Sequence, residues 1–177
     1  MLTKNHVSKM KTILLLTDLS KKAENAAFYA IQLAEKVKAK TILCHSIPAN
    51  DLIFAQEVDD EPSQSKRNLL DHDQAGLKLL ANILKQAVPN ADIELISQVG
   101  DLDTSVKQLI HDKNVDLVVM GAKSDDPEAF YLFGSDAVNV LEHVTCPILF
   151  IPDGIQYDKL DTIVFSNDLK NKYTKNI

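Results

Sequence analysis

The chain has 177 residues, of which 45% are hydrophobic and 25% charged, and its net charge is −6. This length suits one α/β domain with a real core and a short further segment, and the acidic balance argues against a nucleic acid or an anionic membrane as partner, because both attract basic surfaces. Its apolar runs are too short to span a bilayer and its first ten residues lack the apolar core of a signal peptide, so the sequence predicts a cytoplasmic protein.

Short apolar runs alternate with helical periodicity along most of the chain. Residues 12–16 read TILLL, which is typical of a strand buried on both faces, and Ser20 is a suitable N-cap for an alanine-rich helix after it. Further strands are predicted at residues 40–46, 92–98, 116–120 and 147–151, with helices between them. Five strands that alternate with four helices predict a doubly wound, Rossmann-like α/β fold with a parallel sheet.

The segment between the second strand and the next helix has a different character. Residues 49–65 are acidic, contain Pro62 and lack periodicity, so they predict a surface loop. The helix after it carries leucines at helical spacing, and His72 with its neighbours Asp71 and Asp73 is predicted to lie on its solvated face. His45 is predicted to be a packed or edge residue of the second strand.

A glycine-bearing loop follows the fourth strand and reads GAKSDDPEAFYLFGSDA from Gly121 to Ala137. Gly134 and Ser135 open the next helix, whose free N–H groups and dipole favour an anion. Asp18 follows the first strand. Ligands of open α/β sheets bind beyond the carboxyl ends of the strands, where the winding reverses, so the ends of the first and fourth strands are a candidate site.

Three segments resemble the universal stress protein family: ILLLTDLSKKAENAAFYAIQLA, DLVVMGAKS and GSDAVNVLEHVTCPILFIP. The resemblance covers residues 10–152. It implies a five-stranded parallel sheet in the order 3-2-1-4-5, similar to the adenine nucleotide alpha hydrolases, and a homodimer. One branch of the family binds ATP through the pattern Gly-x2-Gly-x9-Gly-Ser/Thr. Here the spacing is intact, but Ser124 replaces the second glycine.

The resemblance also implies which residues border a nucleotide. Asp18 would lie near the adenosine, Ser46 and Ile47 would border the base, and Ser135 would lie near the phosphates. The complete set of candidate cofactor-binding residues is Thr17, Asp18, Ser46, Ile47, Gly121, Lys123, Ser124, Gly134, Ser135 and Asp136. No catalytic constellation and no metal site of protein side chains is predicted.

The loop keeps the form of a phosphate cradle, but its electrostatics oppose a phosphate. Asp125, Asp126 and Glu128 lie in the loop, Asp136 follows it, and Lys123 is its one cation. A Cβ at position 124 also blocks the closest backbone approach. The sequence therefore predicts a stress-response regulator whose cleft binds ATP, with Mg²⁺ as a bridge, weakly or not at all. The alternative is a competent nucleotide sensor or slow ATPase that uses the same cleft, and a third hypothesis is a structural module with a vestigial cleft.

The end of the chain contains an internal similarity. TIVFSNDL at residues 162–169 resembles TILLLTDL at residues 12–19, with a constant offset of 150 residues. This predicts that a second copy of the domain begins there. The predicted organisation is an N-terminal extension at 1–9, a universal stress protein domain at 10–153, and a linker with the first strand of a truncated second repeat at 154–177. An unidentified protein is the predicted partner.

Overall fold

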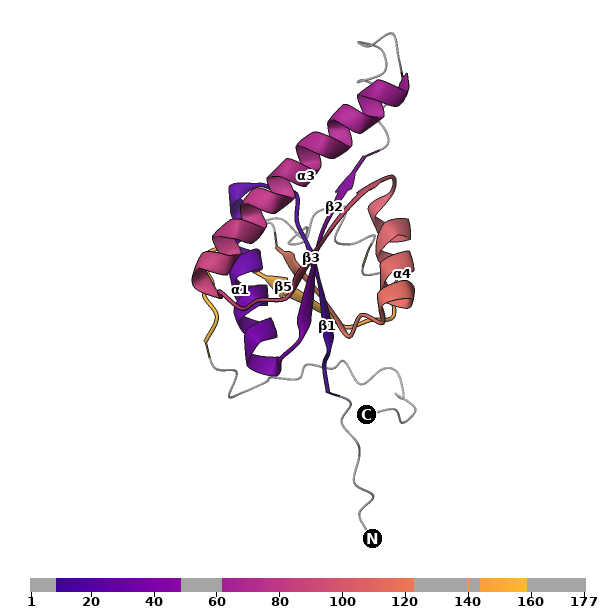
Figure 1. Cartoon of the computed structure of the whole chain (residues 1–177). Coiled ribbons are helices and arrows are strands. Elements are labelled where there is room, and N and C mark those ends of the chain that lie inside the picture. Colours follow the sequence, from indigo (N-terminus) through magenta and orange to yellow (C-terminus); the bar gives the residue numbers. More distant parts are fainter. Residues whose placement is uncertain (1–8, 49–61, 123–139, 141–143, 159–177) are drawn as a thin grey trace, which may run out of the picture.

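A computed structural model describes residues 9–48, 62–122, 140 and 144–158. Its five strands form one parallel sheet in the order β3-β2-β1-β4-β5, which confirms the predicted fold (Figure 1). The strands are β1 (Thr12–Leu16), β2 (Lys40–Ile47), β3 (Ile93–Val99), β4 (Leu117–Gly121) and β5 (Ile148–Ile151). In chain order the sheet grows outward from β1 in both directions, which is what makes the fold doubly wound.

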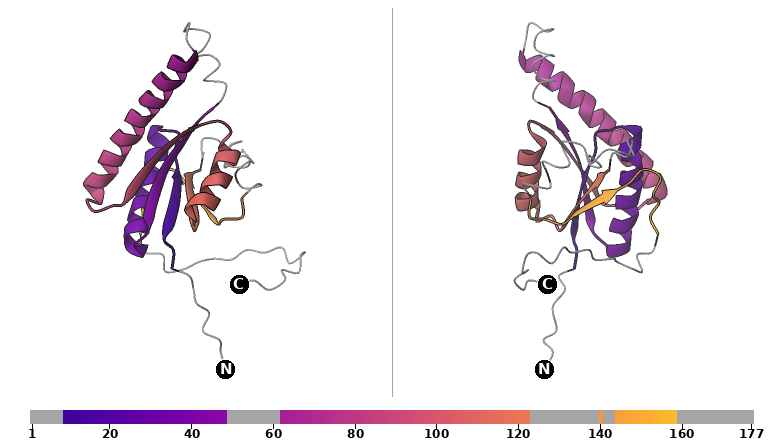
Figure 2. Two further views of the ribbon diagram at one scale, coloured as in Figure 1. Left: turned by 45° about the vertical axis from the view of Figure 1, so that its right-hand side comes forward. Right: turned by 180° about the vertical axis from the view of Figure 1, so that it is seen from behind.

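The helices cover both faces of the sheet. Helices α1 (Lys21–Val37) and α3 (Pro62–Ala87) lie on one face, and α4 (Leu102–Lys113) lies on the other (Figures 1 and 2). Because successive side chains of a strand point to opposite faces, β1 feeds two separate cores. Ile13 and Leu15 pack toward α1 and α3, whereas Leu14 and Leu16 pack toward α4.

Helix α1 follows its sequence signals closely. The hydroxyl of Ser20 accepts a hydrogen bond from the backbone N–H of Ala23, at 3.2 Å, as an N-cap does. The alanines of α1 are buried: Ala23, Ala26, Ala27, Ala30 and Ala34. At its other end Lys38 takes a left-handed conformation, with φ 60° and ψ 45°, and its N–H donates to the carbonyls of Ala34 and Glu35.

Helix α3 begins earlier than predicted. It starts at Pro62, inside the segment 49–65 that was expected to be a loop, so that prediction is wrong for residues 62–65. Proline is well suited to a first helical position, because its φ is already helical and its missing N–H would have no partner there. Residues 49–61 lie outside the described part of the chain.

The chain turns back onto α1 after β5. The side-chain amide of Asn25 donates to the carbonyl of Pro152 at 3.0 Å, and the rings of Tyr29 and Tyr157 meet edge to face with centroids 5.2 Å apart. The predicted N-terminal extension (1–9) and the predicted linker with the start of a second repeat (154–177) lie outside the described residues, except for residue 9 and residues 154–158. No helix within the described ranges is long and apolar enough to cross a membrane.

Candidate functional site

The candidate site lies where β1 and β4 end side by side. These strands pair in register, with Leu14 opposite Val118. From β1 the chain continues into α1 on one face. After β4 it reaches Val140 and Val144, which pack into the core on the α4 face and whose backbones form a helical hydrogen bond of 3.1 Å. The winding therefore reverses between β1 and β4, which is the place predicted for a ligand.

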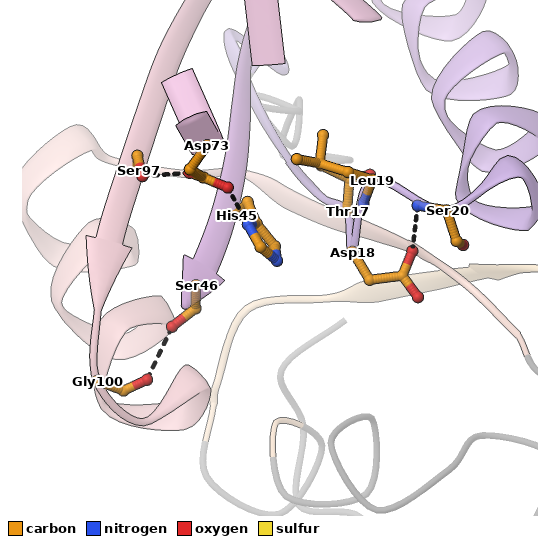
Figure 3. Close-up of polar contacts among 9 residues, drawn as sticks. All are labelled: Thr17, Asp18, Leu19, Ser20, His45, Ser46, Asp73, Ser97 and Gly100. Carbon is orange, nitrogen blue, oxygen red and sulfur yellow. Dashed lines mark hydrogen bonds and ion pairs between the residues drawn. The ribbon is translucent and has the colours of Figure 1, made fainter. Parts of the chain in front are cut away.

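A tight turn holds Asp18 at the end of β1. The hydroxyl of Thr17 accepts from the N–H of Leu19 at 3.0 Å, and the carboxylate of Asp18 accepts from the N–H of Ser20 at 2.9 Å (Figure 3). Leu19 has a φ of 59°, in the left-handed region that costs a residue with a Cβ about 1–2 kcal/mol. Thr17 is buried and Asp18 is exposed. The turn thus presents a carboxylate to solvent at the candidate site.

The predicted base-bordering residues lie beside this turn. Leu16 of β1 pairs with Cys44 of β2, and the N–H of Thr17 donates to the Cys44 carbonyl at 3.0 Å, so Asp18 lies level with Ser46. The Ser46 hydroxyl donates to the carbonyl of Gly100 at 2.9 Å, whereas Ile47 is buried. The structure therefore places Thr17, Asp18 and Ser46 at the ends of neighbouring strands, turns the Ser46 hydroxyl toward β3, and buries the side chain of Ile47 in the core.

Gly121 ends β4 next to this group. A Cβ built there would approach the Cβ of Ala26 to 3.8 Å, an ordinary contact, and Gly121 does not have a positive φ. Neither the backbone conformation nor packing against the described residues requires a glycine. The remaining candidate residues lie outside the described part of the chain: Lys123, Ser124, Gly134, Ser135 and Asp136.

A polar cluster next to the site was missed by the sequence analysis. Asp73 of α3 is 4% exposed and accepts from the hydroxyl of Ser97 on β3, while its other oxygen contacts Nδ1 of His45 on β2 (Figure 3). The prediction of a solvated helix face is wrong for Asp73, although Asp71 and His72 are exposed. The signal was present, because Asp73 precedes Leu77 by four residues and so lies on the buried stripe of α3.

The two cysteines do not add reactive chemistry to the site. Burial, with a contribution from the Asp73 carboxylate, raises the pKa of Cys44 to about 12. Burial also raises the pKa of Cys146, whose thiol contacts the carbonyl of Val115 at 3.5 Å. Both thiols are therefore protonated at neutral pH. Within the described ranges, no group of three His, Cys, Asp or Glu residues is placed to hold a metal ion.

Comparison with known proteins identifies the family. The model of the universal stress protein family matches residues 9–152. Similar structures include the hypothetical protein MJ0577 (21% identity, TM-score 0.63, covering 84% of this chain and 99% of that one) and UspA from Lactobacillus plantarum (18%, 0.62, 81% and 99%). A universal stress protein solved in complex with cAMP is 25% identical, with a TM-score of 0.58, and the match covers 81% of this chain and 98% of that one. A search of curated proteins gave no match. The chain belongs to the universal stress protein family.

Proposed function

We propose that this chain is a stress-response regulator whose cleft at the ends of β1 and β4 binds an adenine nucleotide with low affinity. The observation that carries the proposal is that an exposed carboxylate just after β1 lies at the same edge of the sheet as a glycine that ends β4. Asp18 is exposed and held by its turn, and Gly121 is a glycine that no described neighbour requires. A ligand that approaches the backbone of residue 121 closely would leave no room for a Cβ there, which would explain why this residue is a glycine. The similar universal stress protein that binds cAMP supports the choice of ligand.

Low affinity follows from charge. The sequence places three carboxylates in the loop after β4, with Asp136 just beyond. Each like charge near a bound phosphate costs on the order of 1 kcal/mol at an exposed, screened position. ATP carries more negative charge than AMP or cAMP, so it gains the least from this cleft unless Mg²⁺ offsets its charge. We therefore expect AMP and cAMP to bind at least as tightly as ATP without metal.

Calorimetric titration of the full chain with ATP, ATP with Mg²⁺, AMP and cAMP tests the proposal. We expect dissociation constants weaker than about 1 µM, which corresponds to about −8 kcal/mol. Gly121→Ala should weaken binding without lowering the free energy of unfolding, because the new Cβ meets only an ordinary contact within the described protein and alanine has less freedom than glycine in the unfolded chain. Asp18→Ala should also weaken binding, and Asp112→Ala, an exposed carboxylate at the end of α4, serves as the matched control.

Two outcomes would contradict the proposal. The first is the absence of heat with every nucleotide at millimolar concentration, which would make the cleft vestigial. The second is equal binding by wild type and Gly121→Ala. We further propose that the chain acts as a homodimer, with a protein partner and without turnover. A monomer in sedimentation velocity would contradict the homodimer. Phosphate release from ATP that Asp18→Ala abolishes would contradict the absence of turnover.

A further inference from the structure

The carboxylate of Asp73 joins three elements in a way that excludes one familiar chemistry. A buried carboxylate needs hydrogen-bond donors, and Asp73 has two, the Ser97 hydroxyl and the His45 ring. The carboxylate stands between the serine and the histidine. In a nucleophile-activating triad the histidine stands in the middle and takes the serine proton. In the order observed here the Ser97 hydroxyl donates to Asp73, so His45 is not placed to take its proton as in such a triad.

The cluster fixes the hydrogen-bonding state of the His45 ring. An ionised carboxylate can only accept, so Nδ1 of His45 carries the proton that points to Asp73. In the neutral ring, Nε2 then carries a lone pair and accepts hydrogen bonds. The His45 side chain is 21% exposed, so a solute can reach it. Figure 3 shows the second ring nitrogen pointing away from Asp73, toward the side where Thr17 and Asp18 lie.

Strand register places this acceptor at the candidate site. Thr17 follows Leu16 as His45 follows Cys44, so Thr17 and His45 lie side by side, roughly 5 Å apart as neighbouring strands are. Their side chains share the face that carries α1 and α3, where Leu15 and Leu43 are buried. The residues that follow them are Asp18 and Ser46, beyond the last paired residues of β1 and β2, Leu16 and Cys44. His45 therefore lies one residue before the pair that borders the proposed nucleotide.

We propose that His45 contacts the bound nucleotide directly, with Nε2 accepting a hydrogen bond from a donor of the ligand. The donor is the exocyclic amine of the base or a hydroxyl of the ribose. Asp73 is the positioning residue, because it holds the proton on Nδ1 and so leaves Nε2 as an acceptor. This inference rests on the proposed function and deepens it, since it assigns a residue that selects among nucleotides by their donors.

Titration of AMP into three variants tests the contact. His45→Leu removes the acceptor, and one hydrogen bond of about 1.4 kcal/mol corresponds to a tenfold weaker affinity. His45→Gln places an amide near the position of Nε2 and should recover part of the loss. The control is His111→Leu, because His111 also contacts an aspartate through Nδ1 but lies on the surface with 90% of its side chain exposed. His111→Leu should bind AMP as the wild type does.

Two analogues distinguish the sources of the donor. IMP replaces the amine of AMP by a carbonyl, and 2′-deoxy-AMP lacks one ribose hydroxyl. The wild type should bind one of these analogues about tenfold more weakly than AMP, whereas His45→Leu should bind that analogue and AMP equally. The group that this analogue lacks is the donor. Wild-type binding with an unchanged affinity in His45→Leu would overturn the inference and leave the proposed function intact. A wild type that binds no nucleotide would overturn both.

Nuclear magnetic resonance of the wild type keeps the test independent of variants that fail to fold. The neutral His45 ring should be the Nδ1–H tautomer in a long-range ¹H–¹⁵N spectrum without any ligand. Saturating AMP should shift the Nε2 resonance of His45 and leave that of His111 in place. The opposite tautomer, or an unmoved Nε2 resonance at saturation, would overturn the inference.

Discussion

The N-caps of α1 and α4 differ in one side-chain hydrogen bond. Ser20 caps α1 through its side chain, which accepts from Ala23 N–H, whereas Asp101 caps α4 without a side-chain hydrogen bond. We expect Ser20→Ala to lower the free energy of unfolding by about 1 kcal/mol, because a helical N–H loses its partner. Asp101→Ala should cost clearly less. Urea unfolding followed by circular dichroism measures both, and equal losses would contradict this assignment.

Residue-level prediction worked where the sequence itself carried the geometry. Asp18 was predicted just beyond the first strand, where the structure has it, because parallel strands end at one edge of the sheet. The pairing of His45 with Asp73 was out of reach. The two residues are 28 positions apart, on β2 and α3, and their contact depends on how α3 is rotated about its axis. A single aspartate on an apolar stripe is too short a pattern to fix that rotation.

At the scale of elements, the C-terminus of α1 offers a direct test of backbone strain. Lys38 adopts φ 60° there, and removing its Cβ should relieve about 1 kcal/mol of strain, partly offset by the greater freedom of glycine in the unfolded chain. We expect Lys38→Gly to raise the free energy of unfolding by about 0.5 kcal/mol. Lys36→Gly, two residues earlier within the helix, should lower it by about 1 kcal/mol. Thermal unfolding of the pair decides the matter, and a loss in both variants would refute the strain.

Most helices and strands were predicted correctly from the sequence. Apolar segments predicted all five strands. The continuous run of β1 was placed at its observed bounds, because a strand covered on both faces has no polar alternation. The start of α3 was not, because Pro62 and its acidic surroundings have the composition of a loop. Proline is unfavourable in a helix interior but favourable at a first turn, and composition alone does not tell these positions apart.

At the scale of the whole molecule, an ionic cluster joins β2, β3 and α4 at one edge of the sheet. Glu94 of β3 contacts Nζ of Lys113, at the end of α4, and Nζ of Lys40, at the start of β2, each at 2.7 Å. The side chain of Glu94 is 27% exposed, and those of the two lysines are about 40% exposed. Charge pairs that are this accessible to water contribute about 0–1 kcal/mol, so the cluster modulates stability and does not dominate it.

The cluster nonetheless gives the molecule a defined response to acid. Hydrogen bonds from Lys113 and then Lys40 lower the pKa of Glu94 in the folded protein. The unfolded chain has the ordinary value near 4.3, so the contribution is complete above that pH and disappears as pH falls through the folded pKa. We expect the free energy of unfolding of Glu94→Gln, measured in urea at pH 7, to be lower than that of wild type by less than about 1 kcal/mol. The two free energies should converge toward pH 3. Glu35 lies on the exposed face of α1, and the free energy of unfolding of Glu35→Gln should vary with pH as that of wild type does. If the difference in free energy of unfolding between Glu94→Gln and wild type stays constant from pH 7 to pH 3, the Glu94 side chain contributes through packing alone. The acid response of the protein then belongs to other groups.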